Sequence, residues 1–255
     1  MDRERELIMS TYIDSLTWSD AVERIMSWAK ALEGRTVCLC NVHSVVTARS
    51  DLALREAING CDIASPDGKP VAWLIGRRRK RSQARISGTE LTYALCVEAA
   101  RRDVAVAFYG STDGTLFKLQ EHLVQRFPGL TIVALISPPF RALSTEEDIE
   151  FRRRLNDSGA GIVFIGLGCP KQEVWMAANR DLVNAVTVGI GAAFEFIAGT
   201  VRRPPQWMQR AGLEWLGRLC AEPRRLWRRY LFTNSVFVGY LAHEFLSRKR
   251  HNIDP

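Results

Sequence analysis

The sequence predicts an α/β fold, a mainly parallel sheet with helices on both faces, followed by a C-terminal basic helical appendage. Short apolar runs typical of buried strands alternate with segments in which apolar residues recur every three or four positions. A chain of 255 residues, 47% of them apolar, can bury a large core. Near residue 200 the composition changes abruptly and becomes rich in arginine and tryptophan.

The expected strands are short. An N-terminal strand around residues 8–13 precedes a helix that Thr17 and Asp20 would cap with a capping box. The run from Ile162 to Ile165 has no polar residue, which is typical of a parallel strand buried on both faces. The other strands of the sheet are expected at 37–40, 63–65, 104–109, 130–136 and 185–190, with the run at Ile162 extending to 167.

Helices are expected between these strands, at 45–58, 90–101, 115–127, 146–155 and 171–182. The segment 202–229 holds eight arginines, three tryptophans and two acidic residues. Pro223 suits the first turn of a helix, so two amphipathic helices are expected there, at about 206–220 and 223–246. The chain is therefore divided into an α/β core and an appendage, residues 1–200 and 201–255.

Net charge, cysteine spacing and targeting signals narrow the possible partners and cellular locations of the protein. The net charge of +7 favours an anionic partner, either nucleic acid, a phosphorylated small molecule or a membrane surface. The six cysteines show no CxxC and no zinc-site spacing, so reduced cysteines in the cytosol are expected. The charged N-terminus lacks the apolar run of a signal peptide, and the apolar stretch 231–246 is too short and too polar to span a membrane.

The segment 166–173, GLGCPKQE, ends the most apolar strand with a glycine-broken turn. Gly168 can adopt backbone angles that a side chain would forbid, and Pro170 suits a helix start, so a helix should open at Lys171. Free N–H groups at such a helix start commonly bind phosphate-bearing ligands in open α/β sheets. The alternative is a tight turn with solvated polar residues.

Asp67 directly follows the expected strand 63–65, in a turn that Pro66 and Gly68 shape. A carboxylate at the carboxyl end of a central strand can meet a ligand held by the 166–173 turn. Partial burial would raise its pKa toward that of a useful base. The alternative is that Asp67 only forms an Asx turn.

Asn41 follows the strand 37–40 and should lie on the same edge of the sheet. Its amide can bind a sugar hydroxyl or a base edge, or it can cap a helix that starts near His43. The run 77–81, RRRKR, predicts a dense positive loop that attracts anions, whereas Arg85 precedes a helix and can grip a phosphate with two hydrogen bonds.

These residues belong to a set of motifs that occur in one order along the chain. The set comprises Asn41, DGKP at Asp67, Arg85 with Ser87-Gly88, GLGCPKQE from Gly166, GAAFEFIAG from Gly191 and LEWLGRLCAEPRRLWRR from Leu213. Together they resemble the WecG/TagA/CpsF glycosyltransferases, over nearly the whole chain from about Ile8 to Phe237.

The resemblance implies an inverting transferase of glycosyltransferase family 26 with a Rossmann-like core of its own type. Such enzymes move a sugar from a UDP-sugar donor to a polyprenyl-diphosphate-linked acceptor at the inner face of the cell membrane. The family's proposed catalytic base corresponds to Asp67. Its substrate-binding residues correspond to Asn41, Arg85 and Gln172, and its diphosphate-binding appendage arginines to Arg218, Arg225 and Arg228.

Several departures from the family pattern leave the donor sugar open among N-acetylmannosamine, its uronic acid, glucose or another sugar. Leu39 stands where many members have threonine, residues 138–140 replace a common glycine-aromatic pair, and Glu195 replaces a frequent aspartate. The acceptor glycan and the possibility of a homo-oligomer are open as well.

A metal-dependent nucleotide-sugar enzyme would usually show an Asp-x-Asp pair, and no two aspartates here have that spacing. We therefore expect no cofactor and no metal, with the leaving-group charge offset by arginines and helix dipoles. The tryptophans and arginines of the appendage suit a helix at a membrane surface, although the appendage can instead dock on its own core.

Two other classes of protein fit less well. A nicotinamide-dependent oxidoreductase would show GxGxxG after the first strand of the sheet, and the sequence after 37–40 lacks it. A nucleic-acid-binding module would place its basic residues along one helix. Here the basic residues are split between the loop 77–81 and the appendage. No nucleic-acid partner is expected.

Overall fold

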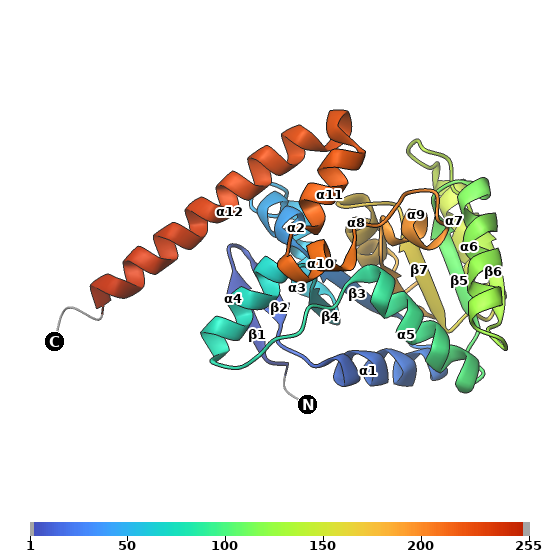
Figure 1. Ribbon diagram of the computed structural model, residues 1–255. Coiled ribbons are helices and arrows are strands. Elements are labelled where there is room, and N and C mark those ends of the chain that lie inside the picture. The colour runs from blue at the N-terminus through green and yellow to red at the C-terminus, as the bar shows by residue number, and fades with distance from the viewer. Residues whose placement is uncertain (1–2, 252–255) are drawn as a thin grey trace.

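A parallel sheet forms the centre of the computed structural model, which describes residues 3–251 (Figure 1). Within that range six strands build the sheet in the order β4-β3-β8-β7-β5-β6, and each neighbouring pair is parallel. The strands are β3 (Arg35–Cys40), β4 (Ile63–Pro66), β5 (Val106–Gly110), β6 (Ile132–Ile136), β7 (Ile162–Gly166) and β8 (Val186–Gly189). The predicted α/β class is confirmed.

Helices cover both faces of this sheet, as predicted (Figure 1). On one face lie α1 (Trp18–Lys30), α5 (Gly88–Arg101), α6 (Asp113–Arg126) and α9 (Ala193–Ile197). On the other lie α2 (Val42–Thr47), α3 (Leu52–Gly60), α4 (Lys69–Arg79), α7 (Thr145–Asp157) and α8 (Lys171–Ala178). β7 is apolar throughout because Phe164 packs into the first layer while Val163 and Ile165 pack into the second.

Two elements near the N-terminus differ from the prediction. The expected strand at 8–13 is a hairpin of β1 (Arg5–Ile8) and β2 (Thr11–Asp14), because the chain reverses at Met9, whose φ is 56°. The expected helix 45–58 is interrupted, since Asp51 accepts a hydrogen bond from the Leu54 N–H at 3.0 Å and thereby starts α3. The capping box of Thr17 and Asp20 is confirmed.

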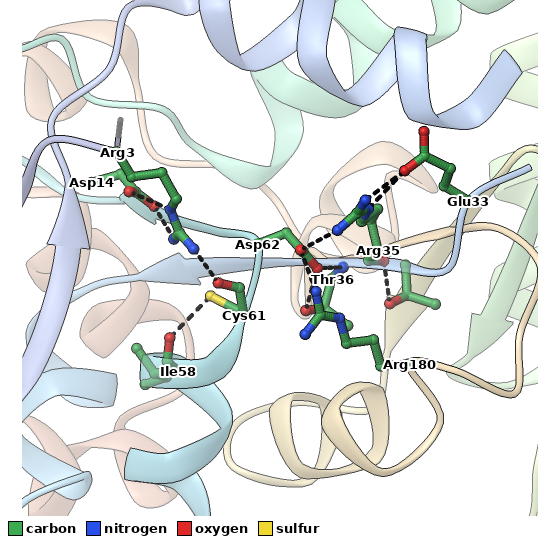
Figure 2. A network of polar contacts seen from close by, with 10 residues as sticks. Arg3, Asp14, Glu33, Arg35, Thr36, Ile58, Cys61, Asp62 and Arg180 are labelled. Carbon is green, nitrogen blue, oxygen red and sulfur yellow. Dashed lines mark hydrogen bonds and ion pairs between the residues drawn. The ribbon is translucent and has the colours of Figure 1, made fainter. Parts of the chain in front are cut away.

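A polar network ties the hairpin and the α8 side to the amino ends of β3 and β4, opposite the edge where the predicted site lies (Figure 2). Arg3 pairs with Asp14 at 2.6 Å and also donates to the Cys61 carbonyl. Asp62 accepts from the backbone N–H of Thr36 at 2.9 Å and pairs with Arg35 and Arg180. Both buried carboxylates of this network, those of Asp14 and Asp62, thus have a charged partner, which is the condition for burying charge at acceptable cost.

The appendage consists of α10 (Gln206–Ala211), α11 (Glu214–Ala221) and α12 (Pro223–His251) in the described part, and its residues 252–255 lie outside that part. The single helix expected at 206–220 is broken, because Gly212 ends α10 with a left-handed φ of 77°. α12 starts at Pro223 as predicted, packs on α2, and extends beyond the core (Figure 1).

The sequence suggested that the run 77–81 is an exposed loop that attracts anions, and the structure corrects this prediction. Most of the run forms the end of α4. Arg78 donates to Glu244 at 2.9 Å and to the Tyr240 hydroxyl at 2.7 Å, both on α12. Arg79 and Arg81 pair with Glu6 and Glu4 near the start of the chain. Intramolecular carboxylates, rather than a ligand, therefore neutralise most of this positive run.

Across the described residues, no helix has both the length and the apolar character required to cross a bilayer.

Candidate active site

A pocket of about 800 Å³ lies at the carboxyl ends of the parallel strands. Several strands place a residue in it just where they end; these residues are Asn41 after β3, Asp67 after β4, Ser111 after β5, Gly166 at the end of β7 and Ile190 after β8. α11 and α12 line its other side. This edge is where open α/β sheets bind their ligands, and the volume suits a small-molecule substrate.

Asp67 and Asn41 meet in this pocket, as the sequence predicted from their positions after neighbouring strands. The backbone of Asp67 is fixed by its N–H, which donates to the Cys40 carbonyl at 2.9 Å. The Asn41 Nδ2 donates to Asp67 Oδ2 at 3.4 Å, while its Oδ1 accepts from the N–H groups of His43 and Ser44. Asn41 therefore caps α2, which is one of the two roles considered for it, and it also contacts Asp67, while substrate binding by Asn41 stays a prediction.

The Asp67 carboxylate has the electrostatics of a base. Burial raises its pKa to about 6, Glu214 adds to the increase, and Arg85 and the Asn41 hydrogen bond oppose it. Its side chain makes no Asx turn with the backbone; within the described chain its hydrogen-bond partner is Asn41. A carboxylate with such a pKa is largely ionised at pH 7 and yet basic enough to accept a proton.

Arg85 also lines the pocket, and it joins the core to the appendage. Its Nη1 lies 2.5 Å from Glu214 Oε2 on α11, and its Nη2 lies 3.4 Å from Glu90 Oε2 on α5. Arg203 extends the network, since it pairs with Glu90 at 2.5 Å and approaches Glu214 at 3.7 Å. Arg85 is thus in the site as predicted, but two carboxylates already bind it.

Gln172 lines the pocket from the first turn of α8 and is 4% exposed. Its Oε1 accepts from the Gly168 N–H at 3.2 Å, and its Nε2 donates to Glu173 Oε1 at 2.9 Å. The Gln172 N–H itself donates to the Gly168 carbonyl. The side chain therefore shapes the turn, and the start of α8 offers fewer free N–H groups than the sequence suggested.

Glu173 lies beside Gln172 and was missed at the sequence level. It is 2% exposed, and burial raises its pKa. One carboxylate oxygen, Oε2, has no hydrogen-bond partner among the described residues. This buried acid is a further polar group on the wall of the pocket that α8 forms.

The predicted appendage arginines do not all face the pocket. Arg218 and Arg225 line it, whereas Arg228 is exposed and stacks on the Trp227 ring, 5.2 Å from its centroid. Arg229, which the sequence analysis did not select, lines the pocket instead. Its Nε has no hydrogen-bond partner among the described residues, and burial together with Arg218 and Arg225 lowers its pKa.

The orientation of α12 explains why Arg229 lines the pocket. Leu226 and Phe237 are the buried apolar residues of α12 and lie eleven positions apart, so they share one face of the helix. Arg229 follows Leu226 by three residues and therefore lies on the same face of the helix. Arg228 follows Leu226 by two residues and points to a different face. Burial, and to a smaller extent the charges of Arg229 and Arg218, lower the pKa of His43 to about 3, so this imidazole is neutral at pH 7.

No group of three or more His, Cys, Asp or Glu side chains suited to a metal ion occurs among residues 3–246, the part with described side chains. The polar groups that converge on the pocket include carboxylates, amides and arginines. This combination suits a transfer reaction on an anionic substrate.

The chain is a glycosyltransferase, because it belongs to the WecG/TagA/CpsF family of glycosyl transferases, whose sequence pattern it matches over residues 7–251. Among individual proteins, it is similar to the N-acetylglucosaminyldiphosphoundecaprenol N-acetyl-beta-D-mannosaminyltransferase of Bacillus spizizenii. The two are 31% identical over 220 residues, which cover 86% of this chain and 83% of the relative. The resemblance seen in the sequence motifs is confirmed.

Proposed function

We propose that this protein is an inverting transferase that moves a sugar from a UDP-sugar to a polyprenyl-diphosphate-linked glycan in cell-surface or exopolysaccharide biosynthesis. One observation carries the proposal: the Asp67 carboxylate and partly unpaired arginines of the appendage face the same pocket. The name of the Bacillus relative supports a lipid-diphosphate acceptor and favours N-acetylmannosamine as the donor sugar over its uronic acid or glucose.

The proposed reaction is a single displacement. Asp67 takes the proton from the acceptor hydroxyl, and that oxygen forms a bond to the anomeric carbon from the face opposite UDP. The bond from the anomeric carbon to the diphosphate breaks, and UDP leaves with the electron pair. The configuration at the anomeric carbon inverts because attack and departure occur on opposite faces.

The negative charge of the leaving diphosphate needs a counter-charge, and the pocket supplies it from Arg218, Arg225 and Arg229. Arg85 can add two further donors through its guanidinium. A reaction that needs neither metal nor cofactor remains our expectation. Asn41 and Gln172 are proposed to orient the substrates, because both line the pocket beside Asp67 and the β7 turn.

A panel of UDP-sugars tests this function directly. With a synthetic N-acetylglucosaminyl-diphosphate-lipid acceptor, we expect acceptor-dependent UDP release with UDP-N-acetylmannosamine, and a product of inverted anomeric configuration by NMR. UDP release that is the same with and without acceptor, for every donor, would contradict the proposal. A thermal shift with a nicotinamide cofactor would instead favour the oxidoreductase alternative.

We also propose that the protein works at the cytoplasmic face of the membrane, peripherally and through α12. Trp227, Leu231 and Phe232 are 48%, 64% and 64% exposed on this helix, with Arg224 and Arg228 between or beside them. Apolar rings and cations in such proximity suit a helix at an anionic lipid surface. Docking on the core and contact with lipid are compatible, because α12 uses different faces for each.

Replacing Trp227, Leu231 and Phe232 together by serine should reduce co-sedimentation with anionic liposomes to background, since the apolar anchor is removed. Activity on a water-soluble short-chain acceptor should persist. Phe117→Ser on α6 is the matched control, because Phe117 is 59% exposed on the core. Equal liposome binding by the triple variant and the wild type would overturn this role.

A further inference from the structure

The Arg85 guanidinium is paired with a carboxylate of the appendage, and both side chains line the same pocket as Asp67. Glu214 on α11 contacts Arg85 Nη1 at 2.5 Å. Asp67 is close enough to Arg85 for the two charges to influence each other's pKa, but no ion pair or hydrogen bond joins them in the described structure. The base is thus near a strong cation without being bound by it.

Two further side chains hold Glu214 in this position. Arg203, in the connection between α9 and α10, approaches Glu214 Oε1 at 3.7 Å and binds Glu90 Oε1 at 2.5 Å. Glu90 in turn lies 3.4 Å from Arg85. The four side chains form a closed ring of alternating charge. Within this ring the shorter contact of Arg85 is the one with Glu214 of α11.

We propose that Glu214 is a positioning residue for the transfer reaction: by binding Arg85 from the appendage, it keeps the Asp67 carboxylate unpaired and available to the acceptor hydroxyl. This inference rests on the proposed function of Asp67 as the base. It assigns the appendage a second task besides supplying arginines to the diphosphate, because α11 also sets the environment of the base that follows β4.

The direction of the effect follows from the groups that face Asp67. Asn41 after β3 and Arg85 before α5 favour its ionised form, while Glu214 on α11 and Glu90 on α5 disfavour it. Lys69 of α4 and Arg203 line the same pocket. Removing the charge of Glu214 takes away a like charge and also frees Arg85 to pair with Asp67. Both changes lower the pKa of Asp67.

The decisive measurement is an NMR titration of the Asp67 carboxyl carbon in full-length protein labelled at aspartate, with Asp67→Asn used to assign the signal. In Glu214→Gln, which retains size and hydrogen-bonding capacity, we expect the pKa of Asp67 to fall by about one pH unit or more. Glu90→Gln, in the same ring, is the matched control and should cause a smaller decrease. An unchanged pKa in Glu214→Gln, or an equal decrease in both variants, would overturn the inference.

Kinetics supply a second and separate measurement. The acidic limb of the pH–rate profile of Glu214→Gln should move to lower pH, because the base ionises earlier, while the plateau kcat falls about tenfold as Arg85 occupies the base. A change in KM alone would indicate a purely structural or binding role. The NMR result does not require turnover, so failure of the proposed function and failure of this inference are distinguishable.

Discussion

Asp67→Asn is expected to lower kcat at least about a hundredfold, since the amide cannot accept the proton of the acceptor hydroxyl. The substitution keeps the shape of the side chain and an oxygen for the Asn41 hydrogen bond. Wild-type activity should rise with pH through the pKa of Asp67, about 6, as the carboxylate becomes ionised. Steady-state UDP release between pH 5 and 9 measures both effects.

The stability of this variant provides the control. Because burial raises the folded-state pKa of Asp67 from its ordinary value of 3.8 to about 6, ionisation of Asp67 lowers the stability progressively between these two pH values and has its full destabilising effect above about pH 6. Asp67→Asn should therefore be at least as stable as the wild type in urea at pH 8. Asp113→Asn, at an exposed position at the start of α6, should retain full turnover. Wild-type turnover in Asp67→Asn would eliminate it as the base.

The second large effect is expected from two adjacent arginines. Arg229→Ala should reduce kcat/KM by about thirtyfold, because a hydrogen bond to a charged group contributes roughly 1.5–3 kcal/mol. Arg228→Ala removes the same charge one residue earlier, from a side chain that stacks on Trp227 outside the pocket lining. With a water-soluble acceptor, Arg228→Ala should change kcat/KM less than about threefold.

The two variants separate the sequence-based assignment from the one based on structure. If Arg228→Ala causes the larger loss with a soluble acceptor, the family-derived assignment of Arg228 to the diphosphate is favoured and ours for Arg229 is wrong. Liposome binding of both variants, measured in parallel, identifies any loss that arises from the membrane surface instead of the pocket.

Much of the fold was predictable because its signals are local. Uninterrupted apolar runs such as β7 indicated parallel strands, and their carboxyl ends located Asn41 and Asp67 on one edge. The boundaries that failed depend on single residues. Asp51 starts a new helix, Met9 reverses a strand, and Gly212 divides a helix of the appendage.

The interactions that sequence reasoning missed are those between distant segments. The positive run 77–81 was assigned to anion attraction, but Arg78 is bound by Glu244, which is 166 residues away. Likewise, the Arg85 and Glu214 pair spans 129 residues, so no pattern near either residue indicates it. The sequence of α12 has apolar residues on several of its faces, so the buried face that carries Leu226, Phe237 and Arg229 became evident only from the structure.

Arg78 also has a consequence for the order in which this protein matures. Its guanidinium donates to the Leu7 carbonyl of β1 at 2.6 Å and to Glu244 of α12, so one side chain joins the first strand to the last helix. On the ribosome, the hairpin and α4 emerge long before Glu244 is synthesised. The contacts of Arg78 with α12, and the pocket wall that α11 and α12 form, can therefore arise only after the hairpin and α4 have been synthesised.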